Sequence, residues 1–214
     1  MNKQAGFTLI ELAIVLVIIG LLLGGVLRGQ ELINSAKVKN MATDFRNKPT
    51  LIYQYQDKFR ALPGDDKSAK EHVGTTATNG DGNGVISGAY NATSGESFQF
   101  WQQIRLANLD VGSTDTSAGS YIPTNAEGGK VGIQSGSTKS IAGLSGSYVF
   151  CSEGILGKFA KQLDTTMDDG NTASGAMMAT AATVDGSTAA AAATSSGTTI
   201  TIDDTLKYTV CMAF

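Results

Sequence analysis

The sequence predicts an α+β fold, in which a long amino-terminal hydrophobic helix packs against a small carboxy-terminal antiparallel β-sheet head. Three observations lead to this class. An almost unbroken apolar run extends from Phe7 to Leu27. An apolar stripe at helical spacing continues beyond it, and short strand-like runs follow residue 129.

Composition limits the functions to consider. The chain has 214 residues, of which 42% are hydrophobic and 16% charged, enough for one domain with its own core and an appended segment. The net charge of −3 gives no general attraction to nucleic-acid phosphates, so a nucleic-acid partner is not indicated. His72 is the single histidine, and no nucleophile, base and orienting acid can be proposed together. We therefore expect the chain not to be an enzyme.

The amino-terminal run differs from a secretory signal. A polar leader, Met1 to Gly6, stands directly before the apolar residues, whereas a signal peptide places its cleavage site after them. By hydropathy the run fits a single-pass membrane anchor. Glu11 is the exception, because a carboxylate is costly to place in a bilayer without a partner.

The six residues Gly6-Phe7-Thr8-Leu9-Ile10-Glu11 resemble the processing site of type IV pilins and type II secretion pseudopilins. In that family a prepilin peptidase cuts after the glycine and methylates the new amino terminus, which here would be Phe7. The family's helices stack in a filament, where the glutamate neutralises the amino terminus of a neighbouring subunit. The resemblance thus implies Gly6 and Phe7 as processing residues, and Glu11 with Phe7 as assembly residues.

Four segments are expected on this basis. They are a prepilin leader at 1–6, a transmembrane and filament-core helix at 7–28, an amphipathic continuation of that helix at 29–62, and a globular head at 63–214. The continuation rests on an apolar stripe with spacings near three and four, which comprises Val38, Met41, Phe45, Ile52, Tyr55 and Phe59. Pro49 is expected to kink or break the helix, and Pro63 to lie just beyond its end.

A glycine-rich stretch from Asn79 to Ile86 predicts either a calcium loop or a tight turn. Oxygen donors at every second position suit calcium, and the expected ligands are Asn79, Asp81, Asn83 and the Val85 carbonyl. The twelfth position, normally a bidentate glutamate, is Tyr90, so further donors would be needed. The candidates for them are Asp65, Asp66 and Glu96. A turn that needs positive φ angles explains the glycines equally well. Calcium is the one cofactor that the sequence suggests.

The remaining head elements follow from local patterns. Thr93-Ser94-Gly95-Glu96 predicts a capping box that opens a short helix through Ala107, with Trp101 as a core anchor. Strands are predicted at 130–133, 147–152, 198–202 and 206–213, the last two as a terminal hairpin. A short helix is expected around Ile155, Phe159, Ala160 and Leu163. Asp168-Asp169-Gly170-Asn171 is predicted to be a turn.

Cys151 and Cys211 are the only cysteines, each inside a strand-like run. In an exported chain they are expected to form a disulfide, which closes a loop of about 60 residues and contributes roughly 4 kcal/mol. Two buried free thiols are the alternative. The family resemblance adds that such a carboxy-terminal disulfide frames an exposed variable region. His72 lies far from both cysteines in sequence and is expected in an exposed loop, which argues against a shared metal site.

Three functions follow as expectations. The first is a type IV pilin that builds a surface filament for adhesion, twitching or uptake. The second is a type II secretion pseudopilin that forms a periplasmic piston, and the third is a monomeric membrane-anchored binding protein. The resemblance implies copies of the chain, prepilin peptidase and an inner-membrane platform with its ATPase as partners. The chain would start in the inner membrane of a bacterium, with a periplasmic head, and would end in an extracellular pilus or a periplasmic pseudopilus.

Overall fold

The computed structural model describes residues 8–138, 140–181, 184, 186, 192 and 201–214. The chain divides into two units, Met1–Lys39 and Asn40–Phe214, and each is described by itself. The second unit contains the carboxy-terminal part of α1 (Leu9–Phe59), the helices α2 (Ala69–His72), α3 (Glu96–Leu106) and α4 (Gly157–Met167), and a four-stranded sheet.

The α1 helix passes Pro49 without a break, and the structure describes its whole length. Proline cannot donate the ladder hydrogen bond to residue 45, yet Phe45, Ile52 and Tyr55 are each 0% exposed and anchor the helix on both sides of it. Of the predicted kink or break at Pro49, the break is wrong, because buried packing offsets one lost hydrogen bond. The helix ends at Phe59, close to the predicted stop at Pro63.

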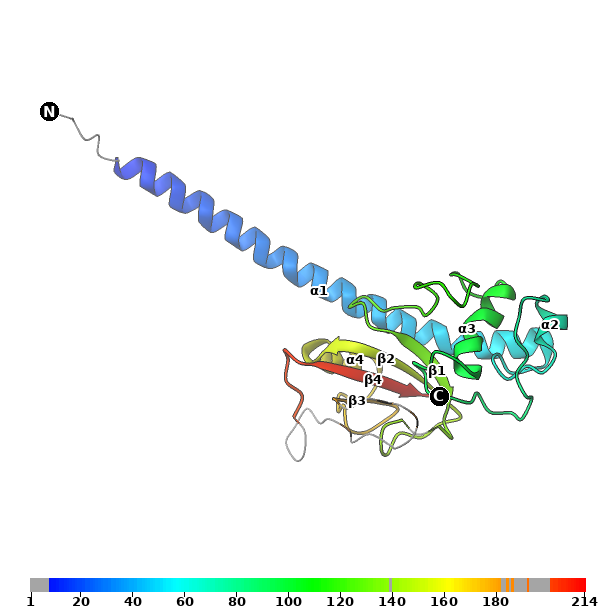
Figure 1. Cartoon of the computed structure of the whole chain (residues 1–214). Coiled ribbons are helices and arrows are strands. Elements are labelled where there is room, and N and C mark those ends of the chain that lie inside the picture. Colours follow the sequence, from blue (N-terminus) through cyan, green and yellow to red (C-terminus); the bar gives the residue numbers. More distant parts are fainter. Residues whose placement is uncertain (1–7, 139, 182–183, 185, 187–191, 193–200) are drawn as a thin grey trace. The chain divides into compact units, whose positions relative to one another are not determined.

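The sheet is antiparallel throughout, with strand order β1-β2-β4-β3 (Figure 1). Its strands are β1 (Val131–Ser135), β2 (Tyr148–Leu156), β3 (Met177–Thr180) and β4 (Lys207–Ala213). The α4 helix packs against β2, β3 and β4, whereas α3 contacts β1. The predicted α+β class, with a long apolar helix and a small antiparallel sheet, is confirmed.

Both faces of the sheet are covered. Alternate residues of a strand point to opposite faces, and Phe150 of β2 meets Phe45 of α1 edge to face, with ring centroids 5.0 Å apart. On the opposite face, Cys151 and Cys211 lie in a buried cluster with Tyr90 and Met178. The strands are therefore core elements, which explains why they have apolar residues on both sides.

Two strand assignments differ from the sequence prediction, at β3 and at Ile155, and a third prediction lies partly outside the described residues. Residues 198–200 of the predicted terminal hairpin lie outside the described part of the chain, and the described neighbours of β4 are β2 and β3. The β3 strand was not predicted, since Met177-Met178-Ala179-Thr180 has a single β-branched residue and no alternation of polar and apolar side chains. Ile155, predicted in the helix, belongs to β2.

The capping box predicted before α3 is also wrong. The helix begins after Gly95, and no side chain among the described residues caps it. The Glu96 carboxylate instead accepts hydrogen bonds from the backbone N–H groups of Asp81 and Ser87. Tertiary contacts have thus replaced the local cap. Trp101, predicted as a core anchor, is 1% exposed, which confirms that role.

The predicted disulfide between Cys151 and Cys211 is confirmed. The two residues are direct partners in the β2–β4 register, so the bond joins the two central strands of the sheet. Its sequence separation is 60 residues, and the enclosed segment includes α4 and β3.

We predict that replacing both cysteines by serine lowers the free energy of unfolding by about 4 kcal/mol, because the unfolded chain regains the entropy of an open loop of this length. Urea unfolding of the detergent-solubilised full chain, followed by Trp101 fluorescence, measures the difference. The untreated wild type and the wild type with reductant serve as references. A loss below about 1 kcal/mol would contradict the prediction.

Candidate functional site

The first unit presents an apolar helix surface. Large apolar side chains of α1 are exposed from Leu9 to Ile33. By length and composition α1 could cross a membrane, and it is the one helix of the described residues that could. Within this apolar surface Glu11 is the single acidic residue before Arg28.

Glu11 forms a capping box at the start of α1. The backbone N–H of Thr8 donates to its Oε2 at 2.8 Å, and the Thr8 hydroxyl donates to the same oxygen at 2.7 Å. In return the Glu11 N–H donates to Thr8 Oγ1 at 3.3 Å. Threonine followed three residues later by glutamate is a sequence signature of a helix start, and that signal could have predicted this cap. Gly6 and Phe7 lie outside the described residues.

The capping bonds fix where the Glu11 carboxylate lies along the chain. Its oxygen contacts the N–H of Thr8, the residue directly after Phe7. A carboxylate at the amino-terminal turn also has a favourable interaction with the helix dipole. The local sequence therefore holds the acid within the first turn of the helix.

The second candidate site is the glycine-rich loop, which Asp65 organises. The carboxylate of Asp65 accepts hydrogen bonds from the backbone N–H groups of Gly82 and Asn83 through Oδ1 and of Gly84 through Oδ2. Gly82 and Gly84 have φ angles of 75° and 86°, which side chains disfavour. A buried acid thus draws successive amides of the loop to one point, so the predicted glycine-rich turn is present.

An acidic cluster forms beside this turn. One ligand atom from each of Asp65, Asp81 and Glu96 can be chosen so that all three lie within 4.8 Å of one another. Asp65 and Glu96 are buried and Asp81 is exposed, so the cluster opens to solvent on one side. Burial raises the pKa of Asp65, which the amides of Gly84, Asn83 and Gly82 partly oppose.

The predicted calcium ligands are only partly gathered at this cluster. Asn83 lies beside Asp81, since its side-chain amide donates to Asp81 Oδ2. Its own Oδ1 accepts the Val85 N–H. The Asn79 side chain instead accepts the N–H of Lys70 in α2. The structure adds Asp65 and Glu96, two of the three supplementary donors expected from the sequence, whereas Asp66 is not part of this cluster.

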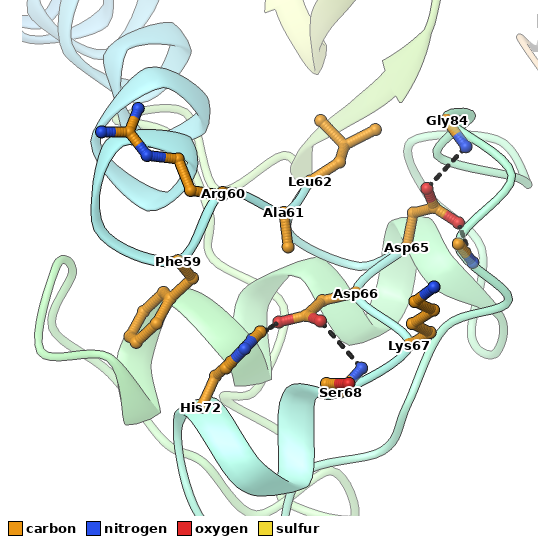
Figure 2. A pocket seen from close by; sticks show the side chains of 11 residues that line it. Phe59, Arg60, Ala61, Leu62, Asp65, Asp66, Lys67, Ser68, His72 and Gly84 are labelled. Atoms are coloured by element: carbon orange, nitrogen blue, oxygen red, sulfur yellow. Dashed lines mark hydrogen bonds and ion pairs between the residues drawn. The ribbon is translucent and has the colours of Figure 1, made fainter.

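A cavity of about 290 Å³ lies next to the loop, between the end of α1 and α2 (Figure 2). Its most buried polar group is the Asp66 carboxylate. This carboxylate accepts hydrogen bonds from Tyr55 Oη at 2.8 Å and from the Ser68 N–H at 2.9 Å, and it pairs with His72 Nδ1 at 2.7 Å. His72 also stacks on Phe59, with ring centroids 5.3 Å apart. His72 therefore lies at the end of α2 and connects it to α1 through Asp66 and Phe59, rather than lying in a loop.

Comparison with known proteins gives a match at the amino terminus. Residues 1–27 match the prokaryotic N-terminal methylation motif. No curated protein and no solved structure matches the chain. The match supports a substrate of prepilin peptidase of the type IV pilin-like or pseudopilin class. Through these residues the chain carries the amino-terminal signature of type IV pilins and pseudopilins.

Proposed function

We propose that this chain is a structural subunit of a type IV pilus-like filament. Prepilin peptidase would cut after Gly6 and methylate Phe7, and the subunit would polymerise through its apolar helix at 7–28. The observation that carries the proposal is the methylation motif at residues 1–27, which overlaps the part of α1 that exposes its apolar side chains. In this scheme 1–6 is the leader, 29–62 continues the helix, and 63–214 is the head.

The apolar helix would be covered twice in the life of the subunit. Its backbone N–H and C=O groups bond within the helix, so lipid and neighbouring helices are both acceptable surroundings. The inner membrane would hold it first, with the head in the periplasm. A membrane platform and its ATPase would then supply the work of extraction, so the subunit's own role is structural.

Glu11 would select the alignment between subunits. An isolated carboxylate in an apolar filament interior costs several kcal/mol, and a paired one much less. The amino group of a processed Phe7 is a cation of the required charge. The capping bonds from Thr8 keep the Glu11 carboxylate at the first turn, where the stagger of a neighbouring helix could bring such an amino group to it.

A secretion pseudopilin, forming a periplasmic piston, is the second candidate. The observation that favours it is the cluster of Asp65, Asp81 and Glu96 beside a glycine loop, since calcium binding is a feature of major pseudopilins. Carboxylate oxygens are the donors that calcium prefers, and a carboxylate that accepts an amide retains lone pairs for a cation. Asp65, Asp81 and Glu96 would hold the ion, with Asn83 beside them.

We predict that Glu11→Ala leaves membrane insertion intact and weakens each subunit addition by roughly 3–5 kcal/mol, because a buried amino group would lose its partner. Filament yield in shear fractions, with membrane fractionation of the same cells, measures both effects. Glu31→Ala is the matched control, since it removes an exposed carboxylate from the same helix, where Glu31 pairs with Arg28. Normal filament yield from Glu11→Ala would count against the pairing.

We predict that Asp81→Ala lowers the thermal midpoint of the head by several degrees in calcium and by little in a chelator, because its carboxylate contributes a ligand. Differential scanning calorimetry of the full chain in detergent provides the measurement. Asp115→Ala is the control, since Asp115 is exposed and its carboxylate accepts hydrogen bonds from nearby Ser117. Equal losses with and without chelator would remove the calcium proposal.

Electron microscopy of sheared filaments, with mass spectrometry of their subunits, separates the two candidates. A pilin is expected in long surface filaments, with Phe7 as the methylated first residue. A pseudopilin is expected to form short periplasmic assemblies and to support export of secreted proteins. A chain that keeps Met1 to Gly6 and forms no polymer under strong expression would contradict both.

A further inference from the structure

The carboxyl end of α4 gathers a second acidic cluster. One carboxylate oxygen from each of Asp164, Asp168 and Asp169 lies within 4.8 Å of the other two. Asp164 belongs to the last full turn of the helix, and Asp168 and Asp169 begin the loop that leads to β3. The cluster grades from a buried to an exposed position in that order, so it has a path to solvent. The segment Asp168–Asn171, predicted to be a turn, thus contributes two of the three carboxylates of this cluster.

Asp164 is the residue that local structure does not explain. It is 1% exposed, and neither of its carboxylate oxygens has a hydrogen-bond partner among the residues that the structure describes. Burial, and after it the charges of Asp169 and Asp168, raises the pKa of the Asp164 carboxyl to about 6. The N–H of Gly170 is near enough to oppose this shift, but it does not form a hydrogen bond. Asp164 is therefore a buried polar group that lacks the hydrogen bonds which normally offset burial.

The helix adds to the electrostatic cost. A helix carboxyl end is the negative end of the dipole, where cations are favoured and acids are not. The last turn of α4, described in full, has no basic residue. Of the two lysines of this helix, Lys161 pairs with Asp204 and Lys158 lies over the ring of Phe159. Three acids and a helix terminus thus place negative charge at one point.

The loop around the cluster is built for close approach. Asp168 accepts the N–H of Met177 at 2.8 Å, which joins the cluster to the first residue of β3. Gly175 comes so close to the Asp168 carboxylate that a side chain there would collide with it, and its φ of 81° also suits glycine. Asp169 accepts the N–H of Asn171 and the hydroxyl of Ser174. These bonds hold two of the three carboxylates beside the buried third.

We propose that Asp164, Asp168 and Asp169 form a divalent-cation site, and that calcium is the ion that it binds. The three oxygens lie close enough together to share one ion. Calcium accepts irregular arrangements of carboxylate oxygens on a loop, whereas magnesium demands a near-ideal octahedron of ligands. Water would complete the six to eight ligands that calcium takes. The ion would neutralise the buried Asp164 and tie the end of α4 to the start of β3. This site is separate from Asp65, Asp81 and Glu96 and does not depend on the filament proposal.

Asp164→Asn tests the site, because it removes the charge and keeps the shape. Calorimetric titration of calcium into the chelator-treated full chain in detergent is expected to show one fewer bound ion per chain than the wild type. Wild-type protein at a calcium concentration about 100 times its dissociation constant should gain about 5–10 °C in thermal midpoint from this site. The variant should lack that gain and should match or exceed the wild type in chelator, since it carries one unpartnered charge fewer.

Two further variants keep the test decisive. Asp169→Asn removes the exposed ligand, and it should weaken calcium binding at least about tenfold without altering the buried position, so it serves if Asp164→Asn does not fold. Asp115→Asn is the exposed control and should titrate like the wild type. Calcium stoichiometry and midpoint gain that are unchanged in both cluster variants would overturn the proposal. The proposal would also be overturned if Asp81→Ala abolished all calcium binding and the two cluster variants did not. That result would instead support calcium binding at the glycine loop.

Discussion

The apolar side chains that α1 exposes between Leu9 and Ile33 must be shielded from water by lipid or by other helices. The proposed membrane and filament states of the chain both depend on this requirement. Transfer of these side chains out of water yields about 25 cal/mol per Å² whether lipid or another helix provides the surface. Apolar contact alone therefore permits many alignments of one helix against the next. Glu11 is the only charged residue between Phe7 and Leu27, so a requirement to pair it would restrict those alignments to few.

The head shows a different use of acids, at the point where the chain leaves α1. Asp65 and Asp66 are adjacent and both are buried, yet each has several donors. Asp65 gathers the amides of the glycine loop, whereas Asp66 joins Tyr55 of α1 to the segment that ends at His72. Hydrogen bonds to a charged acceptor are stronger than neutral ones. Two carboxylates thus order a segment whose sequence offers few apolar residues.

The sequence predicted those elements whose residues encode them locally. The apolar run of α1 and the strand predicted at 147–152, which forms the first part of β2, fall in this group. The disulfide was also predicted, because the chain has only two cysteines. Predictions from local sequence patterns failed where contacts with residues distant in the sequence determine the structure. Glu96 matched a capping pattern, but the amides of Asp81 and Ser87 hold its carboxylate. The clustering of Asp164 with other acids could not be predicted, because Asp168 and Asp169 come close to it only when the loop after α4 folds.

The disulfide and the Asp164 cluster act on one segment by different physics. The Cys151–Cys211 bond limits the unfolded chain and leaves the interior of its 60-residue span unconstrained. A cation at Asp164 would act inside that span, on the junction of α4 with β3, where Met178 lies directly opposite Cys211. Disulfides form in oxidising compartments, and weak calcium sites fill where calcium is near millimolar. In the export that we propose for this subunit, both constraints would take effect after the head leaves the cytoplasm, and the subunit would then be more rigid than when first synthesised.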